Sequence, residues 1–377
     1  MDFTEPYSDD SALREIILER IQSKGPLGFD EFMRLALYHP AHGYYFACEP
    51  ALDYQSSPNV HPVFGAAIAR QVAEFWRLLD RPRPFDIFEA GAGNLSLALA
   101  LLEALRLAEP ELYEVVRYTV QDLTFTDEAV TRLLESAGAP ATKLTVAQNL
   151  PEAPVIEGCI LSNELLDALP FRRIRKRDGR LYELNVGLNG GHFVDVEVDA
   201  SSEVHAYFEA LSLAPAEGCE AEVNLESRDW LVRAVQSLRR GYILTLDYGY
   251  EAAELYAPWR KRGTLLTFYR HASGDDPYVR VGRQDITASV DFTTIRESGE
   301  RAGLCTYGLT TQAELLGALG ISEALRRRPA VDAIEAFYAL RRSLIELINP
   351  TGLGRIRALV QGKETPPATP RGLQSQT

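Results

Sequence analysis

Three polar residues follow one another closely at the end of a mostly apolar stretch. The segment 155–162, VIEGCILS, is followed by Asn163, Glu164 and Asp167, and Pro170 ends the run. In open α/β sheets the carboxyl ends of the strands bind ligands, so this amide and these two carboxylates are candidates for chemistry. The alternative is a turn at a helix N-terminus, where the acids only favour the helix dipole.

A glycine-rich turn follows another apolar segment, residues 85–90. Its sequence is Glu89-Ala90-Gly91-Ala92-Gly93, and glycines at the end of a strand let the backbone approach a ligand that lies over the next helix. A dinucleotide fingerprint needs a third glycine at the position of Ser96. The E-x-G-x-G pattern therefore suits S-adenosylmethionine (SAM), which has no phosphate to bind, although a purely structural turn remains open.

Both groups require a parallel sheet to position them. Apolar segments alternate with helical ones, and the expected strands are 85–90, 118–122, 144–147, 155–162 and 242–249. Helices are expected at 95–107, 128–136 and 227–239. Strand, glycine turn and helix in repetition predict a doubly wound α/β sheet.

An antiparallel hairpin interrupts this alternation. The segments RLYELNVGL and HFVDVEVD flank Asn189-Gly190-Gly191, and the Asn-Gly pair is expected to supply the positive φ of a tight turn. We therefore expect an insertion at about 171–225. Residues 250–300 show no clear periodicity and are expected to be a second, irregular insertion.

The chain ends are expected to be helical or disordered. An N-terminal helical and loop cap is predicted for 1–83, with its first helix at 11–24 capped by Ser11. A C-terminal helical region is predicted for 311–362, including 321–348, and a disordered Pro/Thr/Gln-rich tail for 363–377. The apolar face of the C-terminal helix is expected to comprise Ile334, Phe337, Leu344, Ile345 and Ile348.

The charge balance excludes several classes of partner. The 377 residues contain 39 Lys+Arg and 53 Asp+Glu, a net charge of −14 that repels nucleic acid and anionic membranes and favours cationic partners. No apolar stretch has the roughly 18 residues of a membrane-spanning helix, and the first residues are acidic. We expect no nucleic-acid binding, no membrane insertion and a cytoplasmic location.

Cysteine and histidine spacing gives no sign of a metal site or a disulfide framework. The 4 cysteines form no C-x-x-C pair, and His39, His42 and His61 have no cysteine or carboxylate at ligand spacing. No metal is therefore expected.

Further short motifs accompany these two groups in a fixed order. They are Gly25-Pro26, Glu31-Phe32-Met33, His39 to Tyr45, Asp53 to Pro58, Phe64-Gly65, the glycine turn, Asn163 to Pro170, Asp247-Tyr248-Gly249, Gly263-Thr264-Leu265, Tyr269-Arg270-His271, Gln284 to Thr287 and Val290-Asp291-Phe292. This ordered set, over roughly residues 10–355, resembles the MidA-type methyltransferases. Mitochondrial members of that family serve respiratory complex I assembly and are described as SAM-dependent protein arginine methyltransferases.

The resemblance implies a class I methyltransferase fold, with a seven-stranded Rossmann-like sheet from about 84 to 310. It implies SAM as the cofactor and methyl transfer to an arginine in a cationic segment of a partner protein. The alternatives are a catalytically silent assembly or binding protein that keeps the fold, and a small-molecule methyltransferase. The oligomeric state and the identity of the substrate are not indicated.

The resemblance also assigns cofactor contacts. Gly91 and Gly93 would approach the methionine end of SAM, with Glu89 beneath the turn. Gln121 stands where the family has an acid for the ribose hydroxyls, so Gln121 or the adjacent Asp122 would make that contact.

A loop before the sheet is expected to cover the cofactor. Ser57 and Pro58 match the family's T-S-P loop, and Asn163 is a further cofactor contact. The chain departs from the family pattern at Asn59, Ala92, Leu95, Gln121 and Arg355.

The catalytic assignment follows from the chemistry of arginine. A guanidinium stays protonated at accessible pH. A carboxylate is therefore needed to hold and orient the guanidinium by charge-assisted hydrogen bonds while one of its protons leaves. We assign this role to Glu164, whose Ser-Asn-Glu-Leu-Leu run is also similar to the glutamate loop of enzymes that make symmetric dimethylarginine. Asn163 would fix the turn, Asp167 would be a second carboxylate or a helix cap, and Asp247 with Tyr248 would form the opposite wall.

Overall fold

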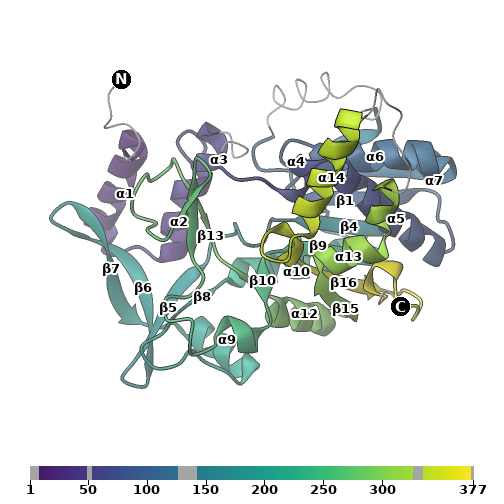
Figure 1. The fold of residues 1–377 in the computed structure, drawn as a ribbon. Helices are drawn as coiled ribbons and strands as arrows, with labels where there is room; N and C mark the ends of the chain where they lie inside the picture. Colours follow the sequence, from purple (N-terminus) through teal and green to yellow (C-terminus); the bar gives the residue numbers. More distant parts are fainter. Residues whose placement is uncertain (1–7, 49–52, 126–141, 326–333, 375–377) are drawn as a thin grey trace. The chain divides into compact units, whose positions relative to one another are not determined.

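The two polar groups lie on one sheet of seven strands (Figure 1). The computed structural model describes residues 8–48, 53–125, 142–325 and 334–374. The strands are β1 (Phe85–Ala90), β2 (Val116–Gln121), β3 (Leu144–Ala147), β4 (Ile156–Asn163), β9 (Leu238–Asp247), β15 (Cys305–Thr311) and β16 (Arg357–Lys363). Across the sheet the strands follow the order β15-β16-β9-β4-β1-β2-β3. Strands β1, β2, β3, β4 and β9 run parallel to one another, and β16 pairs antiparallel with both β9 and β15.

The doubly wound, seven-stranded sheet confirms the predicted fold class, but its predicted limits are wrong. The sheet needs β16, which lies far beyond residue 310 in a region expected to be helical and then disordered. No local sequence pattern identifies β16 as a strand of this sheet, because its partners lie about 110 and 50 residues earlier in the chain.

Both faces of the sheet are covered. Cys159 and Leu161 of β4 belong to one large apolar cluster with the helices α5 (Val63–Leu78) and α6 (Ser96–Ala108), whereas Ile160 between them is equally buried outside that cluster. Because successive residues of a strand point to opposite faces, apolar material packs on each side. This explains why the strand reads as a nearly continuous apolar run.

The chain divides into two compact units, which we call the sheet unit and the insertion unit. The sheet unit comprises Gln55–Leu165, Trp230–Tyr248 and Arg296–Thr377, and the insertion unit comprises Met1–Tyr54, Leu166–Asp229 and Gly249–Ile295. The helices of the sheet unit are α4 (Ser57–Val60), α5 (Val63–Leu78), α6 (Ser96–Ala108), α7 (Pro110–Val115), α13 (Gln312–Ala318), α14 (Ile334–Ile348) and the 3-10 turns at Ile321–Leu325, Leu353–Arg355 and Arg371–Leu373. Helices α10 (Leu225–Ser237) and α12 (Phe292–Arg301) each contain residues of both units.

The insertion unit is built from small antiparallel sheets and helices. Its main sheet has the order β7-β6-β5-β8, from β5 (Arg172–Arg177), β6 (Arg180–Asn189), β7 (His192–Asp199) and β8 (Glu220–Val223). Smaller sheets join β11 (Leu266–Tyr269), β12 (Ala272–Gly274) and β13 (Asp285–Thr287), and pair β10 (Gly249–Tyr250) with β14 (Val290–Asp291). The helices are α1 (Ser11–Lys24), α2 (Phe29–Tyr38), α3 (Tyr44–Ala47), α9 (Ser202–Leu211) and α11 (Ala252–Leu255).

This division corrects two sequence predictions. The expected cap at 1–83 is not one piece, because α1 to α3 belong to the insertion unit and α4 and α5 to the sheet unit. Residues 250–300, expected to be irregular, contain short strands and most of α12. Strands of two to four residues are too short for a periodicity to show in the sequence. The helix expected at 128–136 lies outside the described residues.

The predicted hairpin is confirmed, with a correction to its turn. Asn189 pairs with His192, which leaves Gly190 and Gly191 as a two-residue turn with φ of 57° and 83°. Both central residues of this turn type need positive φ, so the two glycines supply it and Asn189 ends the strand.

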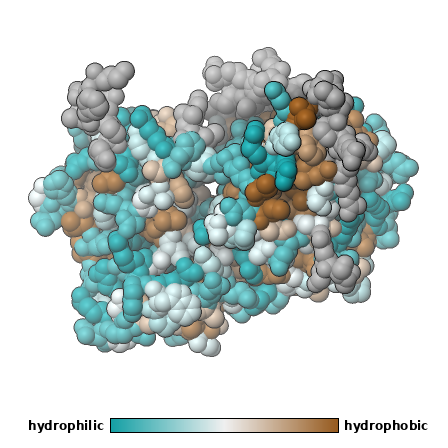
Figure 2. Space-filling view, viewed as in Figure 1, coloured by the Kyte–Doolittle hydropathy of each residue, from teal (hydrophilic) through white to brown (hydrophobic). Residues whose placement is uncertain are grey.

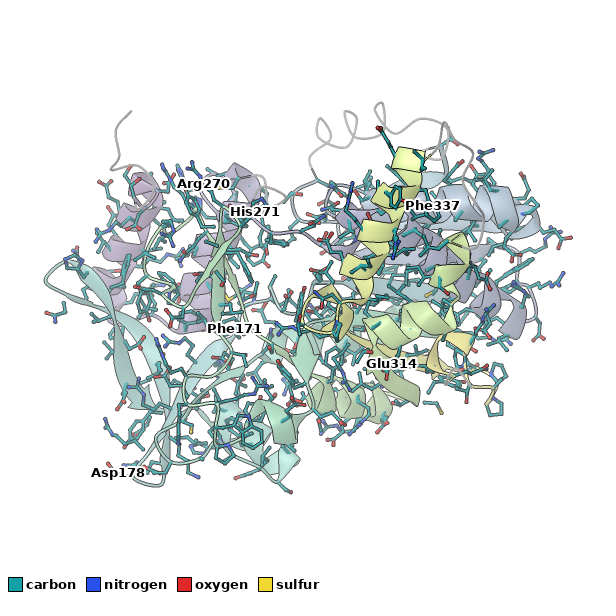
Figure 3. The ribbon with its side chains drawn as sticks, in the orientation of Figure 1. Phe171, Asp178, Arg270, His271, Glu314 and Phe337 are labelled. Atoms are coloured by element: carbon teal, nitrogen blue, oxygen red, sulfur yellow. The ribbon has the colours of Figure 1, made fainter. Side chains whose placement is uncertain are left out.

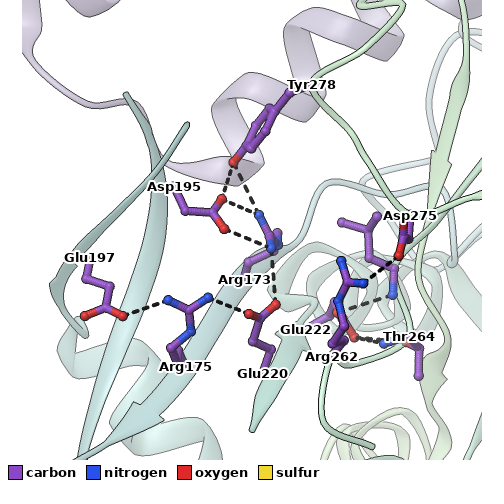
Figure 4. A network of polar contacts seen from close by, with 11 residues as sticks. Arg173, Arg175, Asp195, Glu197, Glu220, Glu222, Arg262, Thr264, Asp275 and Tyr278 are labelled. Atoms are coloured by element: carbon purple, nitrogen blue, oxygen red, sulfur yellow. Dashed lines mark hydrogen bonds and ion pairs between the residues drawn. The ribbon is translucent and has the colours of Figure 1, made fainter. Parts of the chain in front are cut away.

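Charged side chains bind the strands of the main insertion sheet together. Arg173 pairs with Asp195 at 2.6 Å and with Glu220 at 3.3 Å, and Arg175 pairs with Glu220 at 2.5 Å (Figure 4). The buried Glu222 accepts hydrogen bonds from the backbone N–H of Thr264 and Leu265 and from the Thr264 hydroxyl. The Gly263-Thr264-Leu265 motif is thereby fastened to β8.

Other expectations for the chain ends fail. Asp10, not Ser11, caps α1, because its side chain accepts from the Leu13 N–H at 3.0 Å. The tail expected to be disordered is ordered through residue 374: Gly372 is buried, and its N–H donates to Gln71 at 2.9 Å. A Pro/Thr/Gln-rich composition did not reveal this docking because it depends on partners about 300 residues earlier in the chain.

The apolar face predicted for α14 is right at Leu344 and wrong at its three isoleucines. Leu344 and Leu347 are buried, whereas Ile345 and Ile348 are 58% and 39% exposed, and Ile334 is exposed as well. Figure 2 shows brown, hydrophobic surface on this helix. Apolar residues lie on more than one side of α14, so periodicity could not identify the buried side.

Among the described residues, we find no helix with the length and apolar character of a membrane span.

Candidate active site

The turn after β1 opens the backbone at the carboxyl end of the sheet. Gly91 and Gly93 have φ of 71° and 52°, and the N–H groups of Gly91 and Ala92 both donate to the carbonyl oxygen of Gln121. A Cβ on Gly93 would meet no atom within 4 Å, whereas one on Gly91 would come within 3.0 Å of Leu165. The turn therefore leaves open space beside the Gly93 backbone.

The structure separates the two candidates for the ribose contact. Asp122 accepts hydrogen bonds from the Gly93 N–H at 2.9 Å and from the N–H and hydroxyl of Thr124 at 2.9 and 2.7 Å. Gln121, at the end of β2, is half-buried and makes no side-chain hydrogen bond within the described part of the chain. Asp122 thus holds the turn, and Gln121 has the hydrogen-bonding groups available for a ligand.

Glu89 lies beneath the turn, as expected, but faces the interior. Its side chain is only 3% exposed and accepts a hydrogen bond from the Tyr118 hydroxyl at 2.5 Å. Burial raises the pKa of Glu89 to about 7, and the Tyr118 hydrogen bond opposes that shift. Glu89 therefore supports the turn from below.

Glu164 occupies a strained position at the end of β4. Its φ is +50°, which a residue with a side chain seldom adopts, and its N–H donates to the Leu246 carbonyl at 2.8 Å. Its Oε1 accepts from the Ser57 N–H and from the Asn163 amide, both at 3.1 Å. Burial raises the pKa of Glu164 to about 7, and these two hydrogen bonds lower it.

Two polar atoms beside Glu164 are buried without a partner among the described residues. They are the Oγ of Ser162 and the Oδ1 of Asn163. A buried polar atom without a hydrogen bond costs stability, so it suggests a group that a ligand satisfies. Asn163 Oδ1 can only accept, which fits an N–H donor on a bound molecule.

Asp247 is a structural anchor. It is fully buried, and its two carboxylate oxygens accept from the N–H groups of Leu165 at 3.1 Å and Tyr248 at 2.8 Å. It therefore fixes the backbone just after the carboxyl ends of two neighbouring strands, β4 and β9. Tyr248 is half-buried, and its ring lies 5.5 Å from the guanidinium of the exposed Arg355.

Ser57 and Pro58 begin the one-turn helix α4, but Ser57 faces inward. Ser57 is fully buried, and its hydroxyl lies 2.9 Å from the Oε1 of Gln312. Its hydroxyl is thus directed to Gln312 and its N–H to Glu164. Gln312 was missed by sequence reasoning, because no motif marks it and it is 255 residues from Ser57.

Asp167 belongs to the insertion unit and lies in a turn. It is 8% exposed, and its carbonyl oxygen accepts from the Ala288 N–H at 3.1 Å. No helix follows it, because residues 166–169 form turns and β5 begins at Arg172. The expectations of a helix N-terminus here and of Asp167 as a helix cap are therefore wrong, since Pro170 and the strand that follows prevent a helix.

Two motifs of the insertion unit meet at Asp53. Its Oδ1 accepts from the Arg270 N–H at 2.6 Å, its carbonyl from the His271 N–H at 3.0 Å, and its Oδ2 from the Tyr44 hydroxyl at 2.8 Å. Arg270 and His271 both have positive φ, 48° and 62°. Asp53 thus fixes the backbone of a strained turn.

The residues of the sheet unit fit SAM. The open glycine turn, the available Gln121 amide and the unsatisfied Asn163 oxygen lie at the carboxyl ends of β1, β2 and β4, where this fold binds its ligand. Within the described ranges, no group of three His, Cys, Asp or Glu residues could hold a metal ion. Sheet order, glycine turn and polar strand ends together define a class I SAM-dependent methyltransferase.

Comparison with known proteins agrees with this class. Residues 67–310 match the family described as "Putative S-adenosyl-L-methionine-dependent methyltransferase". The chain belongs to this family and is a SAM-dependent methyltransferase. The resemblance and the cofactor predicted from the sequence are thereby confirmed.

Relatives and a solved structure cover most of the chain. A Drosophila melanogaster protein named as a mitochondrial protein arginine methyltransferase, NDUFAF7 homolog, is 26% identical over 78% of this chain and 72% of its own length. Human mitochondrial protein arginine methyltransferase NDUFAF7 is 24% identical over 82% of this chain and 74% of its own. A crystal structure from Burkholderia thailandensis with S-adenosyl-homocysteine bound superimposes with a TM-score of 0.87 at 29% identity, covering 97% of this chain and 95% of the other.

Proposed function

We propose that this methyltransferase modifies an arginine side chain in a cationic segment of a partner protein, with Glu164 as the catalytic residue. The observation that carries the proposal is that only one of the two carboxylate oxygens of Glu164 accepts hydrogen bonds from the described residues. Oε1 is held by the Ser57 N–H and the Asn163 amide, and Oε2 has no hydrogen bond among the residues described. One oxygen is therefore fixed and the other is left for a substrate.

The chemistry of arginine suits this arrangement. SAM supplies, when bound, an electrophilic methyl group on a positively charged sulfur. Glu164 Oε2 would accept a charge-assisted hydrogen bond from the guanidinium and turn one of its nitrogens toward the cofactor site. A cationic group beside Glu164 favours the ionised carboxylate, so the substrate itself would draw Glu164 into its reactive form.

Glu164 would also take the proton that the guanidinium nitrogen must lose. Burial, which raises the pKa of Glu164 to about 7 in the free protein, opposes the lowering by the substrate cation, so Glu164 takes a proton better than an exposed glutamate beside the same cation. Asn163 and the Ser57 N–H would keep the carboxylate in place during this step, and Asp247 would hold the backbone beneath it. The mitochondrial relatives are named as protein arginine methyltransferases, which supports arginine as the substrate residue.

Overall charge supports a cationic partner. A net charge of −14 speeds the encounter with a positively charged segment, and this effect weakens as salt rises. Substrate binding is therefore expected to weaken between low and high salt. Binding that is equal at both would contradict a cationic segment.

The decisive test replaces Glu164 by glutamine, which is nearly isosteric and uncharged. Transfer of tritiated methyl from SAM to a panel of arginine-containing peptides should fall at least about tenfold, equal to roughly 1.4 kcal/mol in the barrier. SAM affinity by calorimetry and the thermal unfolding temperature should be retained. Matched peptides with lysine in place of arginine should not be methylated.

A control comes from the same strand. Glu157 lies near the amino end of β4, where it pairs with Arg239, so Glu157→Gln should leave transfer unchanged. Full activity of Glu164→Gln would refute the arginine mechanism. Loss of folding in that variant would show that Glu164 is structural.

A further inference from the structure

A buried glutamine connects three parts of the sheet unit. Gln312 is the first residue of α13, whose first turn also contains Glu314 (Figure 3), and it has no exposed surface. Its backbone N–H donates to the Ile356 carbonyl at 2.6 Å, which fixes it to the chain just before β16. Its side chain extends from this fixed point to two other elements.

The orientation of the Gln312 amide is determined by its partners. The carbonyl of Leu347, in the last turn of α14, can only accept, and Gln312 Nε2 lies 2.9 Å from it. The amide oxygen must therefore face Ser57, 2.9 Å away. The Ser57 hydroxyl is consequently the donor in that bond.

Ser57 has little local structure to hold it. Helix α4 has four residues, too few for a helix to be stable by itself, and Ser56 makes no side-chain cap. The bond to Gln312 is thus an anchor for the residue whose N–H donates to Glu164 Oε1. The result is a continuous hydrogen-bonded chain from Leu347 through Gln312 and Ser57 to Glu164.

We infer that Gln312 is a positioning residue for Glu164 that acts through Ser57. The inference rests on the proposed function of Glu164 and extends it to a residue that never touches the substrate. Gln312 holds Ser57 so that its N–H keeps Glu164 Oε1 in place and leaves Oε2 toward the substrate. It also makes the carboxylate depend on the position of the α14 C-terminus.

The effect on ionisation has a defined sign. The Ser57 N–H and the Asn163 amide stabilise the charged carboxylate and lower the pKa of Glu164, whereas burial raises it. No charged side chain in the described part of the sheet unit contributes to this pKa. On the adjacent strand β9, the carboxylate of Asp247 is turned to backbone N–H groups. Loss of the Ser57 bond should therefore raise the pKa of Glu164.

The experiment measures this titration without any substrate. The full-length protein is labelled with ¹³C at glutamate side-chain carboxyls, and the Glu164 signal is identified by its absence in Glu164→Gln. Gln312→Met keeps the length of the side chain and removes both hydrogen bonds, and Ser57→Ala removes the hydroxyl. Each should raise the Glu164 midpoint by about half a pH unit to one unit, the effect of one hydrogen bond.

A matched control is available in the same unit. Gln71 is equally buried and bonds to Glu74 and to the Gly372 N–H, with no link to Glu164. Gln71→Met should leave the Glu164 midpoint unchanged. Circular dichroism and SAM binding establish that each variant is folded.

An unchanged Glu164 midpoint in folded Gln312→Met and Ser57→Ala would overturn the inference. If Gln312→Met does not fold, Ser57→Ala, which removes one oxygen, decides the question. The methyl-transfer assay is a separate arm of the test. If both variants shift the Glu164 midpoint but the wild type methylates no arginine peptide, the proposed function is contradicted and the positioning role stands. A methylating enzyme with no shift would contradict only the role of Gln312.

Discussion

Asp122 Oδ2 accepts a hydrogen bond from the backbone N–H of Gly93 at 2.9 Å. A carboxylate at the end of β2 thus holds the glycine turn that follows β1, and its other oxygen holds Thr124. Asp122 was one of two candidates for a direct contact with the cofactor, and its bonds assign it to the turn.

Replacing Asp122 by alanine should therefore weaken SAM binding indirectly. The Gly93 N–H would lose its acceptor and the turn would relax, and the loss of a charge-assisted hydrogen bond suggests about tenfold lower affinity by calorimetry. Asp86 provides the control, because it makes the comparable bond to the Glu157 N–H at the other end of β1. SAM affinity unchanged in Asp122→Ala, or reduced equally in Asp86→Ala, would exclude this role.

Changing Gln121 to glutamate should have the opposite effect. Gln121 offers a neutral hydrogen bond, whereas a carboxylate would make a charge-assisted bond to a hydroxyl, a gain of about 1 kcal/mol or fivefold in affinity. Calorimetry on Gln121→Glu and wild type measures this gain. Equal affinities would mean that another group contacts the ribose.

The buried Glu89 should make stability depend on pH. Its pKa is raised to about 7 in the folded protein, so between its ordinary value near 4.5 and pH 7 the folded state binds more protons than the unfolded state. The free energy of unfolding should therefore fall as pH rises through this window, by about 3 kcal/mol from this group. Glu89→Gln keeps an acceptor for Tyr118 and stays neutral, so it should lose less stability than wild type between pH 5 and pH 8.

Urea unfolding of both proteins at these two pH values tests the prediction. The difference between the proteins isolates Glu89 from other carboxyls that titrate in the same range. An identical pH dependence in wild type and Glu89→Gln would show that Glu89 keeps an ordinary pKa.

Mutating the turn at Arg270 and His271 to residues that favour positive φ should raise the stability of the protein. Both residues occupy left-handed backbone between β11 and β12, where asparagine and glycine are preferred. Replacing them with Asn-Gly should stabilise the protein by about 1–2 kcal/mol, seen as a higher thermal unfolding temperature.

A second turn of the insertion unit is the control. Asp178, labelled in Figure 3, and Gly179 connect β5 to β6 with φ of 53° and 74°, and their residue types already suit the turn. Replacing this pair with Arg-His should destabilise the protein. A loss of stability in the Asn-Gly variant would mean that the packing of Arg270 on the Tyr269 ring, 5.2 Å away, outweighs the strain.

The sequence by itself determined the features that local chemistry encodes. The glycine turn at Gly91 and Gly93 follows from the need for positive φ, and the hairpin follows from two alternating strands around Gly190. The buried parallel strands are visible as apolar runs because both of their faces are covered. Asn163 and Glu164 were located by their place at the end of such a strand.

Only the tertiary structure decided which groups those side chains meet. Gln121 and Asp122 are adjacent in sequence, and their different roles depend on the position of Gly93, 29 residues before Asp122. The strand β16, the docked tail at Gly372 and the bond between Ser57 and Gln312 all join residues that are far apart in the chain. Such contacts have no local sequence pattern, because they form only when packing brings separate segments to the same place.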